Sequence, residues 1–190
     1  MRKIYMFNRT SLDGFFAGLD GNIDWFIPDP EVDGDIHQMM NPDSCLFGRV
    51  TYQLFENYWP MVARNPDAPA GAKTMANELN TMNKLVFSRT LDKLSWENSR
   101  LMKRNLVEEV KQLKQGDGKD LVIFGSGSIV QQLAGEDLID EYLILVTPIA
   151  LGAGKSLFAG VNHSNFKLVE VKSYRSGNVL LHYAPGGKAG

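Results

Sequence analysis

The sequence predicts an α/β fold with a mostly parallel central sheet, helices on both faces and a C-terminal antiparallel hairpin. Two patterns support this prediction. Several short apolar runs lack the alternation of a half-exposed strand, which is typical of strands buried on both faces of a parallel sheet. Segments with helical spacing separate these runs, and an alternation of strands and helices indicates parallel crossovers.

The individual elements follow in order along the chain. The expected strands are the apolar runs 3–7, 44–48, 84–88, 121–124 and 141–148. The expected helices are 29–40, a helix opened by Thr51, and the segments 72–82, 101–115 and 128–134. In the first helix Asp29 is a typical cap, because Pro30 fits the first helical position. In 101–115 apolar residues recur at helical spacing, and Gly116 provides a stop.

The last predicted element is an antiparallel hairpin. After about residue 161 the pattern changes to two strand-like runs, 166–174 and 179–185. The turn residues Ser176 to Asn178 separate them, which is typical of a hairpin connection.

Composition limits the class of protein. A chain of 190 residues with 44% hydrophobic and 22% charged residues predicts one globular domain over 1–185, with a flexible tail at 186–190. A net charge of -2 argues against nucleic-acid binding by phosphate neutralisation. The single cysteine and three scattered histidines predict no disulfide and no metal site. We expect no membrane contact and a cytoplasmic location, because no apolar run has the length of a membrane helix or a signal peptide.

A Gly-Ser-Gly-Ser turn, Gly125 to Ser128, connects an apolar strand to a helical segment. It matches the dinucleotide fingerprint G-x-G-x-x-G only in part, because Val130 stands at the third glycine and no acidic residue follows at the expected distance. Free N–H groups at a helix start still suit a phosphate, and the two serines add hydroxyl donors. The alternative is a tight corner in which Ser128 caps the helix.

Two further strand ends carry similar chemistry. Gly48, Arg49 and Thr51 follow one strand, and Ser88 with Arg89 follows the next. Because the carboxyl ends of strands in an open α/β sheet bind ligands, these turns together predict one extended ligand with several phosphates.

The ordered set of motifs resembles a known family. The stretch TSLDGFFAG (10–18), the helix opening G-R-x-T-Y (48–52), the Ser-Arg pair, the G-S-G-S turn and TPIALGAGKSLF (147–158) occur in the order of the dihydrofolate reductase-like family. They are most similar to the reductase domain of the bifunctional riboflavin-biosynthesis deaminase–reductase and its stand-alone relatives. The resemblance covers about residues 3–183. It implies the dihydrofolate reductase-like fold.

The resemblance implies NADPH as the hydride donor. By position, the pyrophosphate would bind at Gly125, Ser126, Gly127 and Ser128, and further phosphate oxygens at Gly48, Arg49 and Thr51. Ser88 and Arg89 would face the 2′-phosphate that distinguishes NADPH from NADH. The absence of an acidic residue at the expected distance after the Gly-Ser-Gly-Ser turn agrees with NADPH, because an acid there would repel the 2′-phosphate.

The resemblance also implies a substrate end in the loop after the first strand. The expected substrate-binding residues are Asp13, Gly14, Asp24, Trp25 and Phe26, with Asp13 as catalytic proton donor. An ordered water is the alternative donor, and S-L-D-G is also common turn chemistry. The acid that dihydrofolate reductases carry on the following helix has no convincing match among Glu31, Asp33 and Asp35.

Together these interpretations predict an NADPH-dependent reductase acting on a pterin- or pyrimidine-like heterocycle. The alternative is a non-catalytic nucleotide-binding module of the same fold. A third interpretation is that a flavin binds in the cleft. We expect no deaminase domain, because the sequence shows no set of zinc-binding histidine and cysteine residues. The resemblance further implies a homodimer, for which the apolar C-terminal strands would provide an interface.

Overall fold

The computed structural model of the chain describes residues 1–162 and 164–187. Eight strands form one sheet in the order β5 (Ser99–Met102), β4 (Asn83–Phe87), β3 (Pro42–Gly48), β6 (Asp120–Phe124), β1 (Ile4–Ser11), β7 (Glu141–Thr147), β10 (Val179–Pro185) and β9 (Phe166–Ser173). The first six are parallel to their neighbours, and β10 pairs antiparallel with both β7 and β9. The predicted fold class is therefore confirmed.

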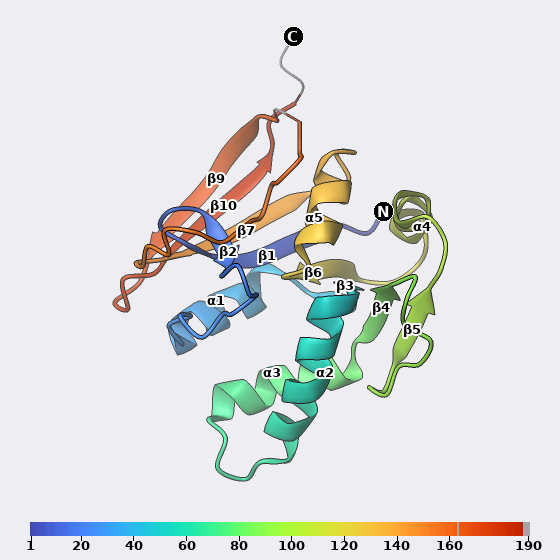
Figure 1. The fold of residues 1–190 in the computed structure, drawn as a ribbon, viewed down its shortest axis with the longest axis horizontal. Helices are drawn as coiled ribbons and strands as arrows, with labels where there is room; N and C mark the ends of the chain where they lie inside the picture. Colours follow the sequence, from blue (N-terminus) through green and yellow to red (C-terminus); the bar gives the residue numbers. More distant parts are fainter. Residues whose placement is uncertain (163, 188–190) are drawn as a thin grey trace.

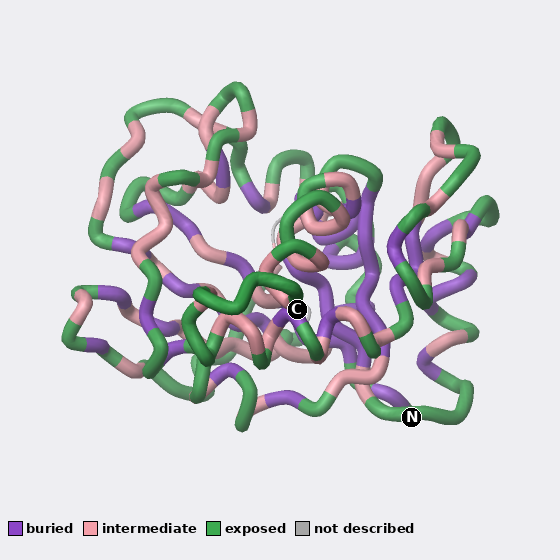
Figure 2. Tube along the Cα trace, turned by 90° about the horizontal axis from the view of Figure 1, so that it is seen from below, coloured by how far each residue is buried: buried purple, intermediate pink, exposed green. Residues whose placement is uncertain are grey.

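Helices cover both faces of the sheet (Figure 1). The first face carries α1 (Pro30–Met39), α2 (Arg49–Arg64) and α3 (Ala70–Thr81), and the second carries α4 (Leu106–Gln115) and α5 (Gly127–Ala134). Alternate residues of the strands pack into two hydrophobic cores, one under each face of the sheet. In β1, Tyr5 packs with the residues under the first face, and Ile4 and Met6 pack under the second. Burial on both faces explains why these strands read as continuous apolar runs. Figure 2 shows the buried stretches along the central strands and the exposed ones along the outer loops.

Several predicted boundaries were wrong. Residues 101–115 are not one helix, because Ser99–Met102 form the edge strand β5 and α4 begins at Leu106. The side chain of Asn105 accepts hydrogen bonds from the N–H groups of Val107 and Glu108, which sets this start. The helix predicted to open at Thr51 begins at Arg49.

A two-stranded sheet was not predicted. It pairs β2 (Phe15–Ala17) with β8 (Lys155–Ser156), and strands this short leave little alternation in the sequence. At the C-terminus the predicted hairpin is present, with Gly177 in its turn at φ 86°. Part of the predicted tail, residues 188–190, lies outside the described residues.

The strand ends place the predicted turns side by side. Because β4, β3 and β6 are parallel neighbours, their carboxyl ends meet at one edge of the sheet. The turns that begin at Ser88, Gly48 and Gly125 therefore follow one another along this edge. Among the described residues, no helix has both the length and the apolar character needed to cross a bilayer.

Candidate functional site

The site begins with two turns at the carboxyl edge of the sheet, Gly48–Thr51 after β3 and Gly125–Ser128 after β6, called here the paired turns. The N–H of Gly48 donates to the hydroxyl of Ser126 at 2.8 Å, and the N–H of Ser126 donates to the hydroxyl of Thr51 at 3.0 Å. These reciprocal bonds fix the starts of α2 and α5 next to each other. The hydroxyl oxygens of Ser126 and Thr51 are thus used within the protein, which the sequence did not indicate.

The helix starts in the paired turns have no side-chain cap. Gly48 at the start of α2 provides none, and Ser126 at the start of α5 uses its hydroxyl oxygen for Gly48 instead. No described residue accepts a hydrogen bond from the N–H of Gly127 or Ser128. Two helix N-termini with free donors and positive dipole ends therefore point to the same place, an arrangement suited to an anion with several phosphates.

The alternative in which Ser128 caps α5 was wrong. Helix α5 begins at Gly127, so the cap position belongs to Ser126 and Ser128 lies within the first turn. Ser126 has the left-handed backbone conformation, with φ 54° and ψ 61°, which costs a serine about 1–2 kcal/mol. The two bonds to the neighbouring turn hold it there, and residues kept in such conformations cluster at ligand sites.

The glycines of the paired turns have close neighbours. A Cβ added at Gly48 would lie 3.2 Å from the hydroxyl of Ser128, and one at Gly127 would lie 2.7 Å from the ring of Phe16. At Gly125, φ is 59° and an added Cβ would lie 3.2 Å from Thr51. Larger residues would therefore fill the turns or displace the ring, so the turns stay open to a phosphate.

The remaining predicted cofactor residues lie along the same edge. Arg49 is exposed and donates to Gln53 at 3.2 Å, so its guanidinium keeps further donors. Arg89 is exposed at the end of β4, and no described residue forms an ion pair with it. Ser88 accepts hydrogen bonds from the N–H groups of Thr90 and Leu91, which shape its turn. The structure thus brings together all nine residues predicted for the cofactor.

An open cleft of about 1780 Å³ continues from these turns between α1 on one side and α2 with α3 on the other. A site for one small molecule usually has about 300–1,000 Å³, so this cleft has room for two ligands end to end. Its lining includes all three turns at the sheet edge. Beyond them, apolar and aromatic side chains line it: Phe7, Phe26, Ile36, Met40, Leu54, Phe55, Tyr58, Trp59 and Met75.

The predicted substrate residues divide into two groups. Asp24 and Phe26 line the cleft, whereas Asp13, Gly14 and Trp25 do not. Asp13 is exposed, and its carboxylate accepts hydrogen bonds from the N–H groups of Leu151 and Gly152 and from the hydroxyl of Ser11. The hydroxyl bond and these backbone bonds lower the pKa of Asp13 to about 2. Its carboxylate thus holds the backbone of Leu151 and Gly152 and does not line the cleft.

Asp33 of α1 is a cleft residue that the sequence did not distinguish from its acidic neighbours. It lines the cleft and lies 3.3 Å from Arg9 of β1, whose guanidinium also donates to the carbonyl of Ile27 at 2.9 Å. Desolvation raises the pKa of Asp33, although the charge of Arg9 opposes this shift. The spacing of α1 alone could not select Asp33 over Glu31 or Asp35, because the distinguishing partner lies on another strand.

Lys155 of β8 is a second lining residue that was not predicted as a site residue. It stands close to Gly21, where an added Cβ would lie 3.2 Å from its amine nitrogen. Lys155 belongs to the segment 147–158, one of the motifs that resemble the family. This motif was the signal in the sequence that could have identified it as a site residue.

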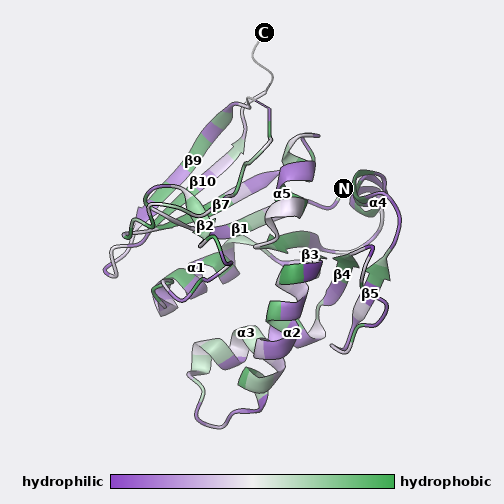
Figure 3. Cartoon of the chain, viewed as in Figure 1, coloured by the Kyte–Doolittle hydropathy of each residue, from purple (hydrophilic) through white to green (hydrophobic). Residues whose placement is uncertain are grey.

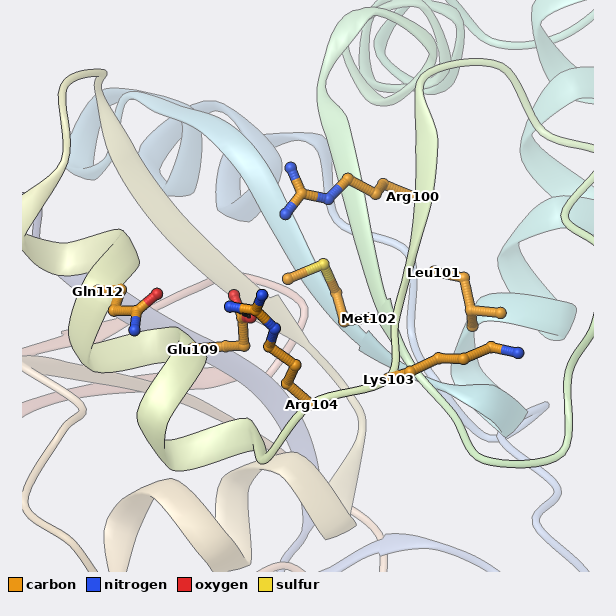
Figure 4. A pocket seen from close by; sticks show the side chains of 7 residues that line it. All are labelled: Arg100, Leu101, Met102, Lys103, Arg104, Glu109 and Gln112. Carbon is orange, nitrogen blue, oxygen red and sulfur yellow. Dashed lines mark ion pairs between the residues drawn. The ribbon is translucent and has the colours of Figure 1, made fainter.

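A smaller cavity of about 360 Å³ lies between β5 and α4 (Figure 4). None of its lining residues lines the cleft. Arg104 and Glu109 form an ion pair there at 3.4 Å, and Lys103 points away from them. Within residues 1–162 and 164–187, no three histidine, cysteine or acidic side chains gather as metal ligands would. His163 lies outside the described residues.

Comparison with known proteins identifies the family. Residues 2–181 match the RibD C-terminal domain. The chain belongs to this family. One relative, the uncharacterized protein YyaP of Bacillus subtilis (strain 168), is 33% identical over 183 residues. The match covers 96% of this chain and 94% of that protein.

Two solved structures share the fold of this RibD C-terminal domain. A diaminohydroxyphosphoribosylaminopyrimidine deaminase/5-amino-6-(5-phosphoribosylamino)uracil reductase of Thermotoga maritima gives a TM-score of 0.69 at 16% identity, covering 97% of this chain and 56% of that one. A dihydrofolate reductase of Enterococcus faecalis complexed with NADP(H) gives 0.63 at 14% identity, covering 97% of each chain. The dihydrofolate reductase-like fold and the family expected from the motifs are both confirmed.

The contacts of Asp13 predict a pH-dependent loss of stability in Asp13→Asn. The folded-state pKa of about 2 lies below the ordinary value of 3.8, so the carboxylate contributes stability above about pH 4 and loses it as the pH falls toward 2. We expect Asp13→Asn to unfold at a lower temperature than the wild type at pH 7, with the difference shrinking between pH 4 and pH 2. Thermal unfolding followed by circular dichroism measures it, and an equal difference at pH 7 and pH 2 would contradict the assignment.

Proposed function

We propose that this protein is an NADPH-dependent reductase that transfers a hydride to a pterin- or pyrimidine-like heterocycle. The observation that carries the proposal is the pair of uncapped helix N-termini at the sheet edge, joined by reciprocal hydrogen bonds and opening into a cleft with room for a second ligand. Membership of the RibD C-terminal domain family supports it.

The three turns suit the parts of NADPH in the order in which they lie along the sheet. Ser88 and Arg89 at β4 would hold the 2′-phosphate, because a guanidinium and a hydroxyl form charge-assisted bonds with a dianion. The paired turns would hold the pyrophosphate with backbone donors, Arg49 and Ser128. The nicotinamide would then lie toward β1 and β2, where Phe16 and Ala17 line the cleft. When bound, NADPH supplies the hydride.

Asp33 is our candidate for the proton that accompanies the hydride. Reduction of a C=N bond places the hydride on carbon and requires a proton on nitrogen. Asp33 lines the substrate end of the cleft, and desolvation raises its pKa above the usual value for an aspartate. After it gives up the proton, the carboxylate lies 3.3 Å from Arg9, whose charge stabilises the product state.

A nucleotide-binding module without turnover is the rival proposal. It rests on the same turns and predicts NADPH binding without reduction of any heterocycle. A flavin phosphate is the third candidate for these turns, because a single phosphate would also fit the backbone donors. A cytoplasmic location remains part of the proposal, since a reductase of this kind needs NADPH at hand.

The cofactor assignment predicts selective stabilisation by NADPH. At 100 times its Kd, NADPH should raise the free energy of unfolding by about 2.7 kcal/mol, with NADH and FMN giving smaller shifts. Arg89→Ala should weaken NADPH binding by roughly 10- to 100-fold and leave NADH binding unchanged, because only NADPH carries the 2′-phosphate. Differential scanning fluorimetry measures both. Arg64→Ala, an exposed arginine at the far end of α2, is the control. A larger shift with FMN, or an unchanged preference in Arg89→Ala, would contradict the assignment.

The proton assignment predicts a specific defect in Asp33→Asn. With any heterocycle that a panel shows to be reduced, we expect the rate to fall by about 10²–10⁴-fold while NADPH affinity stays the same. Because the acid must be protonated, the wild-type rate should decrease as the pH rises through the raised pKa of Asp33, and this limb should disappear in the variant. Glu31→Gln, an exposed acid on the same helix outside the cleft, is the matched control. A variant with the wild-type rate and pH profile would show that the proton comes from elsewhere.

We further propose a homodimer that pairs through the edge strand β9. Leu168, Val169 and Val171 of this strand are about half exposed, and an open apolar edge favours strand pairing with a second copy. Light scattering should give a mass of twice 21.2 kDa, and Val171→Lys should shift it toward the monomer. Leu19→Lys, which alters an exposed apolar residue elsewhere, should not. A monomeric wild type would refute the dimer.

A further inference from the structure

Helix α2 carries apolar side chains on two faces. One face, with Tyr52, Phe55 and Trp59, packs into the core beneath the sheet. The other face carries Val50, Leu54 and Tyr58, which follow one another at intervals of four residues and are 64%, 46% and 53% exposed. A surface helix normally turns one apolar stripe to the core and polar residues to water, so a second stripe needs a partner. Figure 3 shows hydrophobic and hydrophilic segments alternating along this helix.

The second stripe faces the cleft. Val50, Leu54 and Tyr58 all line it, whereas Met61, farther along α2 and 63% exposed, does not. Ile36 of α1 and Met40, which follows this helix, also line the cleft. Tyr58 contacts Trp59 edge to face with ring centroids 5.1 Å apart. This part of the cleft therefore offers apolar and aromatic walls to a flat ring.

The charges of this part of the cleft leave no unpaired cation for a phosphate. Arg9 lies 3.3 Å from Asp33, and His37 lies 3.2 Å from Glu78. The other arginine and the lysine side chains that line the cleft lie elsewhere. Arg49, Arg89 and Lys155 border the turns and β2, and Lys119 donates to Asn41 at 3.1 Å at the opposite end. A dianion between α1 and α2 would thus compete with Asp33 and the carbonyl of Ile27 for Arg9, and with Glu78 for His37.

We infer that the substrate is an uncharged or cationic planar aromatic heterocycle without a phosphate group, held against Leu54 and Tyr58. This inference rests on the proposed function, because it assigns the strand-end turns to the cofactor and the apolar part of the cleft to the substrate. It names the substrate class and two residues that determine specificity. The phosphates of the complex then belong to the cofactor alone.

Riboflavin and FMN test the inference, because they share one flat ring system and differ by a single phosphate. The probes are titrated into the wild-type protein with the cofactor turns saturated by NADP⁺, which blocks them without allowing turnover, and fluorescence anisotropy reports binding. Lumichrome, a planar ring without a side chain, is a third probe. We expect riboflavin and lumichrome to bind and FMN to bind roughly tenfold or more weakly than riboflavin.

Substitutions on one helix assign the binding surface. Leu54→Lys and Tyr58→Lys should each weaken riboflavin binding by about tenfold, because the apolar contact is lost. Met61→Lys makes the same change on the same helix outside the cleft, and should bind riboflavin as the wild type does. Leu54, Tyr58 and Met61 are all exposed, so the three variants should fold, and circular dichroism checks this.

The outcomes separate this inference from the proposed function. Equal or tighter binding of FMN, no binding of any probe, or equal losses in Met61→Lys and Leu54→Lys would each overturn the inference. Whether NADP⁺ itself stabilises the protein against heat is read in the same samples. If it does not, the cofactor assignment fails, while the preference for riboflavin and its loss in Leu54→Lys still support the apolar part of the cleft.

Discussion

Two hydrogen bonds between the turns after β3 and β6 determine the arrangement of the site. Gly48 donates to Ser126, and Ser126 donates to Thr51, so neither turn can move without the other. They also remove the side chain that would ordinarily cap α5, since the Ser126 hydroxyl oxygen is already engaged. The free donors of the two helices consequently remain at one edge of the sheet. A backbone conformation that is unfavourable for serine is stable here because both of its polar groups are satisfied.

The same constraint divides the cleft into two chemical environments. Near the paired turns, backbone N–H groups and arginines border the cleft. Farther along, the apolar stripe of α2 lines the cleft, together with the pairs Arg9–Asp33 and His37–Glu78. A pyrophosphate and a flat ring have opposite requirements, and each environment satisfies one of them. This division favours the reductase over a module that binds a nucleotide alone, since such a module has no use for a second apolar face on α2.

How much the sequence could predict depends on where the deciding contacts lie. Strands buried on both faces and turns at their carboxyl ends are local patterns, and the fold and the three turns followed from them. The start of α4 was misplaced because Leu101 and Met102 extend its apolar spacing, although they belong to the edge strand β5. Whether Asp13 or Asp33 lines the cleft depends on contacts with residues 151–152 and with Arg9, far away in the sequence, so no local pattern distinguishes them.

The two acids illustrate how environment separates residues of the same type. Asp13 is exposed, yet hydrogen bonds from Ser11 and two backbone N–H groups keep it ionised. Asp33 lines the cleft with its side chain 55% exposed, and desolvation raises its pKa while the charge of Arg9 lowers it. A proton donor must hold its proton before the reaction and tolerate the charge afterwards. At Asp33, desolvation favours the first condition and the guanidinium of Arg9 favours the second.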